Sequence, residues 1–359
     1  MKVNIRKISE RTGFSPATVS NALNHKRGVN KDTAAEILKT AKEMGYVTEA
    51  GITKIKLVIY RDRGLIVGDN PFFSLVVDGF EKACREAGYE MALLNLDRQA
   101  EDYEKQVENL LLDQSTAIVL YGSELTDEEA AIFKKARTPF LILDYWNHDM
   151  SFNGVFINNA DAARMAGEYL IKRGHTEIGY LKGSYRIKAF GSRSVGLQIA
   201  MKKHNLRLKP EYIVTLPVTM DDAYQQMLKY LDRNLKLPTA FFADNDNLAL
   251  GAMQALKERG FSIPGDISII GFDDLPFCEI AVPRLTSLRV PKQDMGRLAV
   301  REIVDMIQGK NTTKTKIQIC TEFMERDSVQ RNSALKTAVE DCARPGWLCR
   351  IYARADQGD

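Results

Sequence analysis

The chain has 359 residues, of which 45% are hydrophobic and 27% charged, and its formal net charge is +3. This length is too great for one small domain and fits a small module followed by a large two-lobed unit. The first ten residues lack the apolar run of a signal peptide and no stretch has the length of a membrane span, so we expect a cytoplasmic protein without a membrane partner.

The positive charge is confined to the amino-terminal end of the chain. Residues 1–56 contain 11 Lys and Arg residues against 5 Asp and Glu residues, whereas the rest of the chain contains 39 against 42. A locally basic segment in a nearly neutral chain is typical of a nucleic-acid-binding module.

The first two dozen residues have the start and stop signals of two short helices. Asn4 is a suitable N-cap for a helix that ends near Arg11, and Gly13 follows where a left-handed turn residue is needed. Ser15 then caps a second helix, and Pro16 occupies its first position, where the missing N–H costs nothing.

The second predicted helix has an apolar and a polar side. Val19, Ala22 and Leu23 form its inward edge. The outward-facing residues are small enough for the backbone to lie close to the floor of a DNA groove, and they are Pro16, Ala17, Ser20 and Asn21. A third helix runs from a cap at Asn30 to Gly45. The pattern predicts a helix-turn-helix, and a three-helix bundle without a DNA role is the alternative.

From Lys56 onward, predicted strands and amphipathic helices alternate. The first series has strands at 56–61, 90–96, 116–121 and 139–143 and helices at 73–88, 101–113 and 126–136. After a strand at 155–157, the second series has helices at 160–173, 191–204, 221–233 and 247–259 and strands at 177–181, 239–243 and 267–271. This alternation predicts parallel sheets in two α/β lobes. Ligands of such sheets bind beyond the carboxyl ends of the strands, so we expect a site between the lobes.

Polar and aromatic residues follow several of these strands. The candidate effector contacts are Asn70, Phe72, Phe73, Asp144, Tyr145, Arg193, Asn245, Asp246 and Asp273. They suit a polyol, because carboxylates accept hydrogen bonds from neighbouring hydroxyls, a guanidinium donates several, and aromatic faces pack on C–H surfaces. Structural roles are the alternatives: Asp246 as the cap of a helix from Asn247, Asp273 in a turn, and Phe72 or Phe73 in the core.

Several stretches of the chain carry a family resemblance: residues 13–24, 167–179, 242–251, 263–274 and 283–288. With them, residues 3–332 resemble the lactose/galactose repressor (LacI/GalR) family, whose core is similar to periplasmic sugar-binding proteins. The resemblance implies an α/β fold, with an N-terminal three-helix helix-turn-helix module and a two-lobed periplasmic-binding-protein-like (type I) domain with parallel sheets. Arg193, for which a solvated helix position is the alternative, is similar to the family's effector-binding arginine.

The resemblance also implies how the chain is divided. Its crossings between the lobes are expected near Asn158, Leu288 and Cys320. Residues 1–50 would form the DNA-binding domain and residues 51–332 the effector-binding and dimerisation domain. One lobe would comprise about 54–158 and 289–319, and the other about 159–288 and 320–332. Residues 333–359 form a tail without a counterpart in the family.

The function implied is that of a sequence-specific transcriptional regulator, expected to be a repressor. A homodimer would bind a near-palindromic operator, under the control of a small ligand, expected to be a sugar. The residues expected at the DNA are Ser15, Pro16, Ala17, Thr18, Ser20, Asn21, Asn24, His25, Lys26 and Arg27. The alternatives are a purine-type corepressor as the ligand, or a soluble sugar-binding protein, which should carry a signal peptide and lack residues 1–46.

Two departures from the family pattern concern the DNA. The link at 47–53 lacks the usual hinge helix, which argues against an apolar wedge in the minor groove. Asn21 stands where many relatives carry arginine, and because asparagine pairs with adenine whereas arginine reads guanine, a different operator base is expected there.

The sequence contains none of the motifs that would indicate an enzyme. No G-x-G-x-x-G follows the first strand, no G-x-S-x-G elbow occurs, and the four histidines and five cysteines form no cluster. We therefore expect no enzyme activity, no cofactor and no metal.

Overall fold

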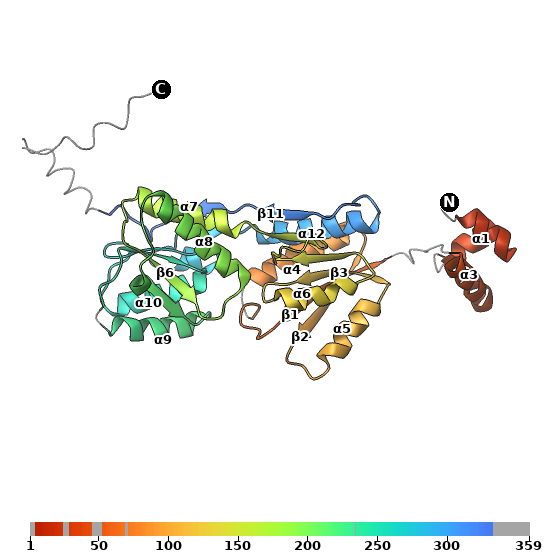
Figure 1. Ribbon diagram of the computed structural model, residues 1–359, viewed down its shortest axis with the longest axis horizontal. Coiled ribbons are helices and arrows are strands. Elements are labelled where there is room, and N and C mark those ends of the chain that lie inside the picture. The colour runs from red at the N-terminus through yellow and green to blue at the C-terminus, as the bar shows by residue number, and fades with distance from the viewer. Residues whose placement is uncertain (1–3, 24–28, 45–51, 69–70, 234, 333–359) are drawn as a thin grey trace, which may run out of the picture.

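The computed structural model describes residues 4–23, 29–44, 52–68, 71–233 and 235–332 (Figure 1). Within these ranges no helix is long and apolar enough to cross a membrane. Some of the predictions lie outside the described residues: those for Asn24, His25, Lys26, Arg27, Gly45 and Asn70, most of the link at 47–53, and the tail at 333–359.

Three helices form the amino-terminal module: α1 (Ile5–Thr12), α2 (Pro16–Leu23) and α3 (Lys31–Glu43). The backbone N–H of Lys7 donates to Asn4 Oδ1 over 3.1 Å, and that of Thr18 donates to Ser15 Oγ over 3.1 Å, so both predicted caps are present. Gly13 ends α1 at a φ of +73°, which glycine adopts without a Cβ penalty. The apolar sides of the helices meet in a small core of Ile8, Val19, Ala22, Leu23, Ile37 and Ala41.

The first lobe is built on a parallel sheet with the strand order β11-β5-β4-β3-β1-β2. Its strands are β1 (Lys54–Arg61), β2 (Glu90–Asp97), β3 (Thr116–Tyr121), β4 (Phe140–Leu143), β5 (Asn153–Ile157) and β11 (Lys316–Ile319). The residues of β1 alternate between two buried faces, as in a sheet covered on both sides. Ile55, Leu57 and Ile59 belong to one hydrophobic core, and Val58 and Tyr60 belong to another.

Helices cover both faces of this first sheet. Residues of α4 (Pro71–Glu86) and α12 (Lys292–Ile307) complete the core around Leu57. On the other face lie α5 (Tyr103–Leu112), the short α6 (Asp127–Ile132) and the 3-10 turn η1 (Phe133–Lys135). Figure 1 shows α4 and α12 close together behind the sheet, with α5 at its opposite side.

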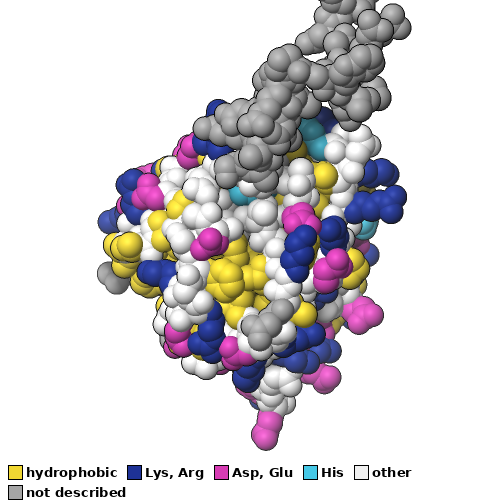
Figure 2. Space-filling view, turned by 90° about the vertical axis from the view of Figure 1, so that its left-hand side faces the viewer, with side chains coloured by type: hydrophobic (Ala, Val, Ile, Leu, Met, Phe, Trp, Pro, Cys, Tyr) yellow, Lys and Arg dark blue, Asp and Glu magenta, His cyan; other side chains and the backbone are white. Residues whose placement is uncertain are grey.

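The second lobe is built on a four-stranded parallel sheet in the order β7-β6-β8-β9. Its strands are β6 (Ile178–Gly183), β7 (Ile213–Leu216), β8 (Ala240–Ala243) and β9 (Ser268–Ile270). The pairs α7 (Asn159–Lys172) with α8 (Lys188–Lys203) and α9 (Met220–Leu231) with α10 (Asp246–Glu258) pack side by side, and η2 (Pro210–Tyr212) and α11 (Phe277–Ile280) are short. Seen from this end of the molecule, hydrophobic side chains gather at the centre of the surface, with charged side chains around them (Figure 2).

The chain passes between the two sheets at three places. It leaves β5 at Ile157 and enters α7 at Asn159. The strands β10 (Ser287–Arg289) and β12 (Glu322–Met324) pair antiparallel, and they carry the other two passages side by side. A two-lobed unit joined by three chain segments is the architecture implied by the family resemblance.

Some element boundaries were predicted wrongly, and some elements were missed. Helix α8 begins at Lys188, three residues before the predicted start, because the preceding Ile187 supplies no side-chain cap that would mark it. Helix α10 begins at Asp246, one residue early, because Asn245 and not Asp246 is its N-cap. The pattern missed β7, α11, α12 and β10–β12, most of which are short or follow the last predicted strand.

Candidate functional site

A small cavity lies where residues of the two lobes meet beyond the ends of their strands. The first lobe contributes Ile66, Phe72, Phe73, Tyr121, Ser123, Asp144 and Ile157 to its lining, and the second contributes Ile187, Ala189, Phe190, Arg193, Asn245 and Asp273. Its volume is about 30 Å³. We name it the inner cavity. Six of the nine predicted effector residues line it.

Arg193 is the buried centre of this site. Only 3% of it is exposed, so it is not the solvated helix residue that the sequence left open. Its Nε donates to Asn159 Oδ1 over 2.8 Å, and its terminal nitrogens contact the carbonyl of Asp244 and, at 3.2 Å, Asp273 Oδ1. Its guanidinium carbon lies 3.6 Å from the centre of the Phe272 ring. The guanidinium is thereby held in one orientation.

A half-buried carboxyl group, Asp144, and a buried one, Asp273, face this site from opposite lobes. Asp144 follows β4 at a φ of +61°, and Asp273 follows β9 at a φ of +105°. Burial raises the pKa of Asp144 to about 6, against the opposing effects of hydrogen bonding by Ser123 and of the charge of Arg193. Burial also raises the pKa of Asp273, although Arg193 and the ammonium of Lys292 oppose this. Backbone in sparsely populated conformations is often found at binding sites.

The two phenylalanines are both core residues and cavity residues. Phe72 is 7% exposed, belongs to the core of the first lobe, and has the ammonium of Lys292 at 5.5 Å from its ring centre. Phe73 packs against Tyr121 in an edge-to-face arrangement, with ring centres 5.1 Å apart. Both rings line the inner cavity.

Asp246 does not contact the cavity, contrary to the sequence prediction. It is fully buried, and its carboxylate accepts hydrogen bonds from Ser287 Oγ over 2.7 Å and from the backbone N–H of Leu275 over 2.8 Å. The cap role falls to Asn245, whose Oδ1 accepts from the N–H of Leu248 over 3.1 Å. Because α10 begins one residue earlier than predicted, Asp246 points towards the segment after β9.

A second cavity of about 180 Å³ adjoins the first. We name it the outer cavity. Its lining residues are Ser123, Asp144, Tyr145, Trp146, Phe156, Ile157, Asn159, Ala160, Lys188, Ala189, Ser192 and Gln318. Tyr145 lies here, and its hydroxyl donates to Asp127 Oδ1 over 2.7 Å. The predicted set of effector residues did not include Tyr121, Ser123 and Asn159, although each stands at or just after a strand end, which was the available signal.

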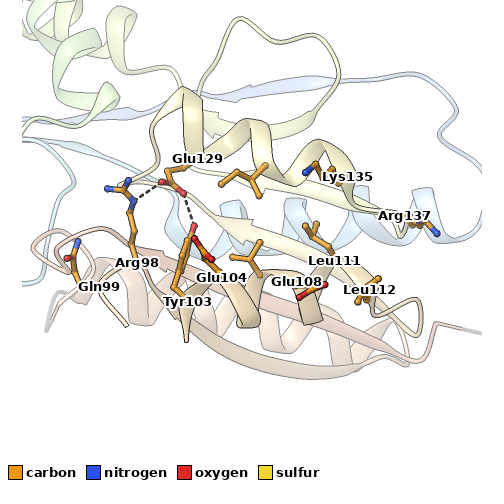
Figure 3. Close-up of a pocket in the computed structure, with 12 residues that line it drawn as sticks. Arg98, Gln99, Tyr103, Glu104, Glu108, Leu111, Leu112, Glu129, Lys135 and Arg137 are labelled. Atoms are coloured by element: carbon orange, nitrogen blue, oxygen red, sulfur yellow. Dashed lines mark hydrogen bonds and ion pairs between the residues drawn. The ribbon is translucent and has the colours of Figure 1, made fainter. Parts of the chain in front are cut away.

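A larger cavity, about 790 Å³, lies away from this site, between α5 and α6 (Figure 3). At its polar end, Glu129 accepts a hydrogen bond from the hydroxyl of Tyr103 over 2.7 Å and contacts Arg98 Nε at 2.6 Å. These polar groups therefore hydrogen-bond or pair with one another. Most of the remaining lining residues are side chains of α5, including Leu111 and the exposed Leu112. No predicted effector residue lines it.

The second helix of the amino-terminal module presents the predicted DNA-facing residues. Ser15, Pro16 and Ala17 are exposed, and Thr18, Ser20 and Asn21 are half-buried. Val19, Ala22 and Leu23 are buried on the opposite side of α2. Ser15 Oγ and Thr18 Oγ1 lie 2.8 Å apart, so the cap of the helix involves both hydroxyls. A small, polar helix face is therefore available for a groove.

Comparison with known proteins gives consistent matches along the chain. A model described as a periplasmic binding protein-like domain matches residues 168–329. The HTH-type transcriptional repressor PurR of Vibrio vulnificus is 31% identical over 333 residues, which cover 91% of this chain and 98% of that protein. The solved regulatory protein of the LacI family from Chloroflexus aggregans is 26% identical with a TM-score of 0.67, covering 77% of this chain and 99% of its own.

This chain belongs to the LacI/GalR family of transcriptional repressors. A solved lac repressor dimer, bound to operator and the anti-inducer ONPF, has the same fold at 22% identity, with a TM-score of 0.69 over 92% of this chain and 100% of its own. Like other LacI/GalR repressors, this protein is a DNA-binding transcriptional regulator controlled by a small ligand and is not an enzyme. Among the described residues, no group of three His, Cys, Asp or Glu side chains could hold a metal ion.

Proposed function

We propose that the small ligand is a carbohydrate bound at the inner cavity. The observation that carries this proposal is the arrangement of Arg193, Asp144 and Asp273, which direct a fixed donor from helix α8 and two acceptor groups from the ends of β4 and β9 to one cavity. Vicinal hydroxyls both donate and accept hydrogen bonds, so they match this combination. The rings of Phe72 and Phe73 supply the apolar surface that the C–H groups of a sugar ring require.

Binding would change how far the two lobes are closed. The inner cavity of about 30 Å³ is far smaller than typical ligand pockets of roughly 300–1,000 Å³. A sugar ring can enter only if the lobes separate, so the ligand favours one degree of closure over another. The module at residues 1–50 precedes β1 of the first lobe in the chain, which gives lobe movement a route to the DNA-binding helices.

We infer that the protein acts as a symmetric homodimer on a near-palindromic operator. Two copies of α2 would then lie in successive major grooves. The exposed Pro16 and Ala17, together with Asn21, would contact base edges, and Ser15 and Ser20 would lie nearer the phosphates. The solved lac repressor dimer bound to its operator supports this assembly by analogy of fold.

A purine is the second candidate ligand, because Phe72 and Phe73 could also stack on a planar base. The two classes are separated by thermal unfolding of the full-length protein with monosaccharides, disaccharides or purine bases. A ligand at about one hundred times its dissociation constant adds roughly 2.7 kcal/mol to the free energy of unfolding. We expect carbohydrates alone to raise the Tm. A shift with purines and none with carbohydrates would contradict the proposal.

Variants connect the thermal shift to the site. Arg193→Ala and the milder Asp144→Asn should both abolish the carbohydrate-induced shift. Arg297→Ala should retain it, because Arg297 pairs with Asp294 on the surface, where 46% and 63% of the two side chains are exposed. The same ligand should change the affinity for operators selected from random DNA, in a salt-dependent binding assay. A ligand that shifts the Tm equally in all three variants binds elsewhere.

A further inference from the structure

The ligand site continues beyond the inner cavity. Ser123, Asp144, Ile157 and Ala189 line both the inner and the outer cavity, so the two spaces have common walls. The outer cavity, at about 180 Å³, is much the larger of the two. A group that occupies the outer cavity would therefore lie next to a sugar ring held at Arg193.

Trp146 forms an aromatic wall of the outer cavity. Its ring centre lies 4.9 Å from that of Phe156, and the ammonium of Lys316 lies 4.6 Å from the Trp146 ring. Lys316 is itself held by Asn147, whose Oδ1 accepts its hydrogen bond over 3.1 Å. Although it is supported in this way, Trp146 is 37% exposed. A braced and partly exposed indole is suited to packing against the C–H face of a sugar.

Neutral polar groups line the same cavity as Trp146. Gln318, from β11, and Ser192, which precedes Arg193 on α8, line the outer cavity from opposite lobes. Within the described residues, the Gln318 amide and the Ser192 hydroxyl have no hydrogen-bond partner. The cation of Lys188 is neutralised by Asp127. Besides Asp144, which it shares with the inner cavity, the outer cavity offers an amide and a hydroxyl, which both donate and accept hydrogen bonds.

We propose that the outer cavity is a second sugar subsite and that the effector has at least two sugar units. One unit lies against Arg193 and Asp273, and the next packs on Trp146 and hydrogen-bonds to Gln318 and Ser192. This inference rests on the proposed carbohydrate function and specifies it. Trp146 and Gln318 then determine the length of the ligand, whereas Arg193 determines whether any sugar binds.

The test uses the two tryptophans of the chain, Trp146 and Trp347. In a Trp347→Phe background, Trp146 is the only tryptophan, and its fluorescence reports on the outer cavity. Full-length protein is titrated with glucose, galactose and fructose and with maltose, cellobiose, lactose, sucrose and trehalose. We expect at least one disaccharide to bind about tenfold more tightly than its component monosaccharides, equivalent to about 1.4 kcal/mol. Only the disaccharide should change the emission of Trp146.

Variants, followed by thermal shift, separate the subsite from the fold. Trp146→Ala and Gln318→Ala should weaken disaccharide binding and leave the weaker monosaccharide binding unchanged, and Trp146→Phe should retain most of the disaccharide affinity. Met150→Ala is the control, because Met150 is 76% exposed in the same connection and lines neither cavity.

Each negative outcome has a distinct meaning. If disaccharides bind no better than monosaccharides, or if Trp146→Ala weakens both equally, the second subsite is excluded. The proposed function then stands, provided that Arg193→Ala still abolishes monosaccharide binding. If no saccharide of either length shifts the Tm, both the second subsite and the carbohydrate assignment are overturned.

Discussion

Carboxyl groups with raised pKa values stand after strands of both lobes, and their protonation couples the stability of the fold to pH. Burial raises the pKa of Asp144 to about 6 and, with the nearby charge of Asp273, raises that of Asp246 to about 7, from an ordinary value of 3.8. Between pH 4 and these values, the folded protein holds protons that the unfolded chain has released. These two groups therefore stabilise the fold less as the pH rises through that window.

Replacing Asp246 by asparagine isolates one of these groups. The amide can still hydrogen-bond to Ser287 and to the N–H of Leu275, but it does not titrate. We expect the free energy of unfolding of Asp246→Asn to increase, relative to wild type, as the pH is raised from 4 to 7. Urea unfolding at each pH measures this difference. A difference that is constant with pH would show that Asp246 is not protonated in the folded state.

At the scale of single elements, the α7–α8 pair shows how one position can decide the packing of two helices. A Cβ added at Gly196 of α8 would lie 2.0 Å from the carbonyl oxygen of Ala160 in α7. The two helix backbones can approach this closely only at a glycine. Because α8 also carries Arg193 and Lys188, the packing of these helices sets the position of both cavity residues.

Two glycines in α8 provide a matched pair of substitutions. Gly196→Ala should lower the free energy of unfolding by about 1–3 kcal/mol, because α8 must move away from α7. Gly191→Ala should raise it by about 0.5–1 kcal/mol, because no atom lies within 4 Å of the added Cβ and alanine favours a helix. Chemical denaturation measures both. Equal effects of the two substitutions would contradict the close approach of α7 and α8.

Helix α2 offers a test of the DNA contact at residue 21. We expect operators selected from random DNA by the wild-type protein to carry adenine opposite Asn21, and those selected by Asn21→Arg to carry guanine. Ala35→Ser, at an exposed position of α3 outside the predicted DNA-facing residues, is the control and should not change the base at that position. Selection of guanine by wild type and by Asn21→Ala alike would exclude a direct contact.

At the scale of the whole molecule, a few contacts bridge the two lobes. The hydroxyl of Tyr185, from the second lobe, donates to Asp62 Oδ2 of the first lobe over 3.1 Å. Lys188 of α8 contacts Asp127 of α6, which also accepts from Tyr145. These contacts hold the lobes in the arrangement in which the inner cavity is small. Ligand entry must compete with them.

Tyr185→Phe removes one bridging hydrogen bond, worth about 0.5–1.5 kcal/mol. We expect a larger radius of gyration in X-ray scattering than for wild type, and a ligand affinity changed by up to about tenfold. Tyr230→Phe is the control, because its hydroxyl donates to the carbonyl of Glu211 over 3.0 Å within the second lobe. An unchanged radius of gyration and affinity in Tyr185→Phe would mean that this contact does not control closure.

Local signals in the sequence were sufficient to predict the amino-terminal module and most elements of the lobes. The caps at Asn4 and Ser15 and the turn at Gly13 depend on neighbours within a few residues, so they can be read from the sequence. The long strands and helices follow from hydrophobic periodicity. Short elements such as β10 and β12 carry no such signal, because their partner strand lies far along the chain.

The sequence by itself determined the family, the helix-turn-helix and the α/β alternation, because motifs and periodicity are properties of neighbouring residues. Only the tertiary structure decided which way each candidate side chain points. Arg193 and Asp246 were both predicted at the cleft, but Asp246 is held by Ser287, 41 residues further on, whereas Arg193 turns inward onto Asp273 and Phe272. Likewise, the volume that remains between the lobes depends on contacts such as Tyr185–Asp62, which join residues distant in the chain.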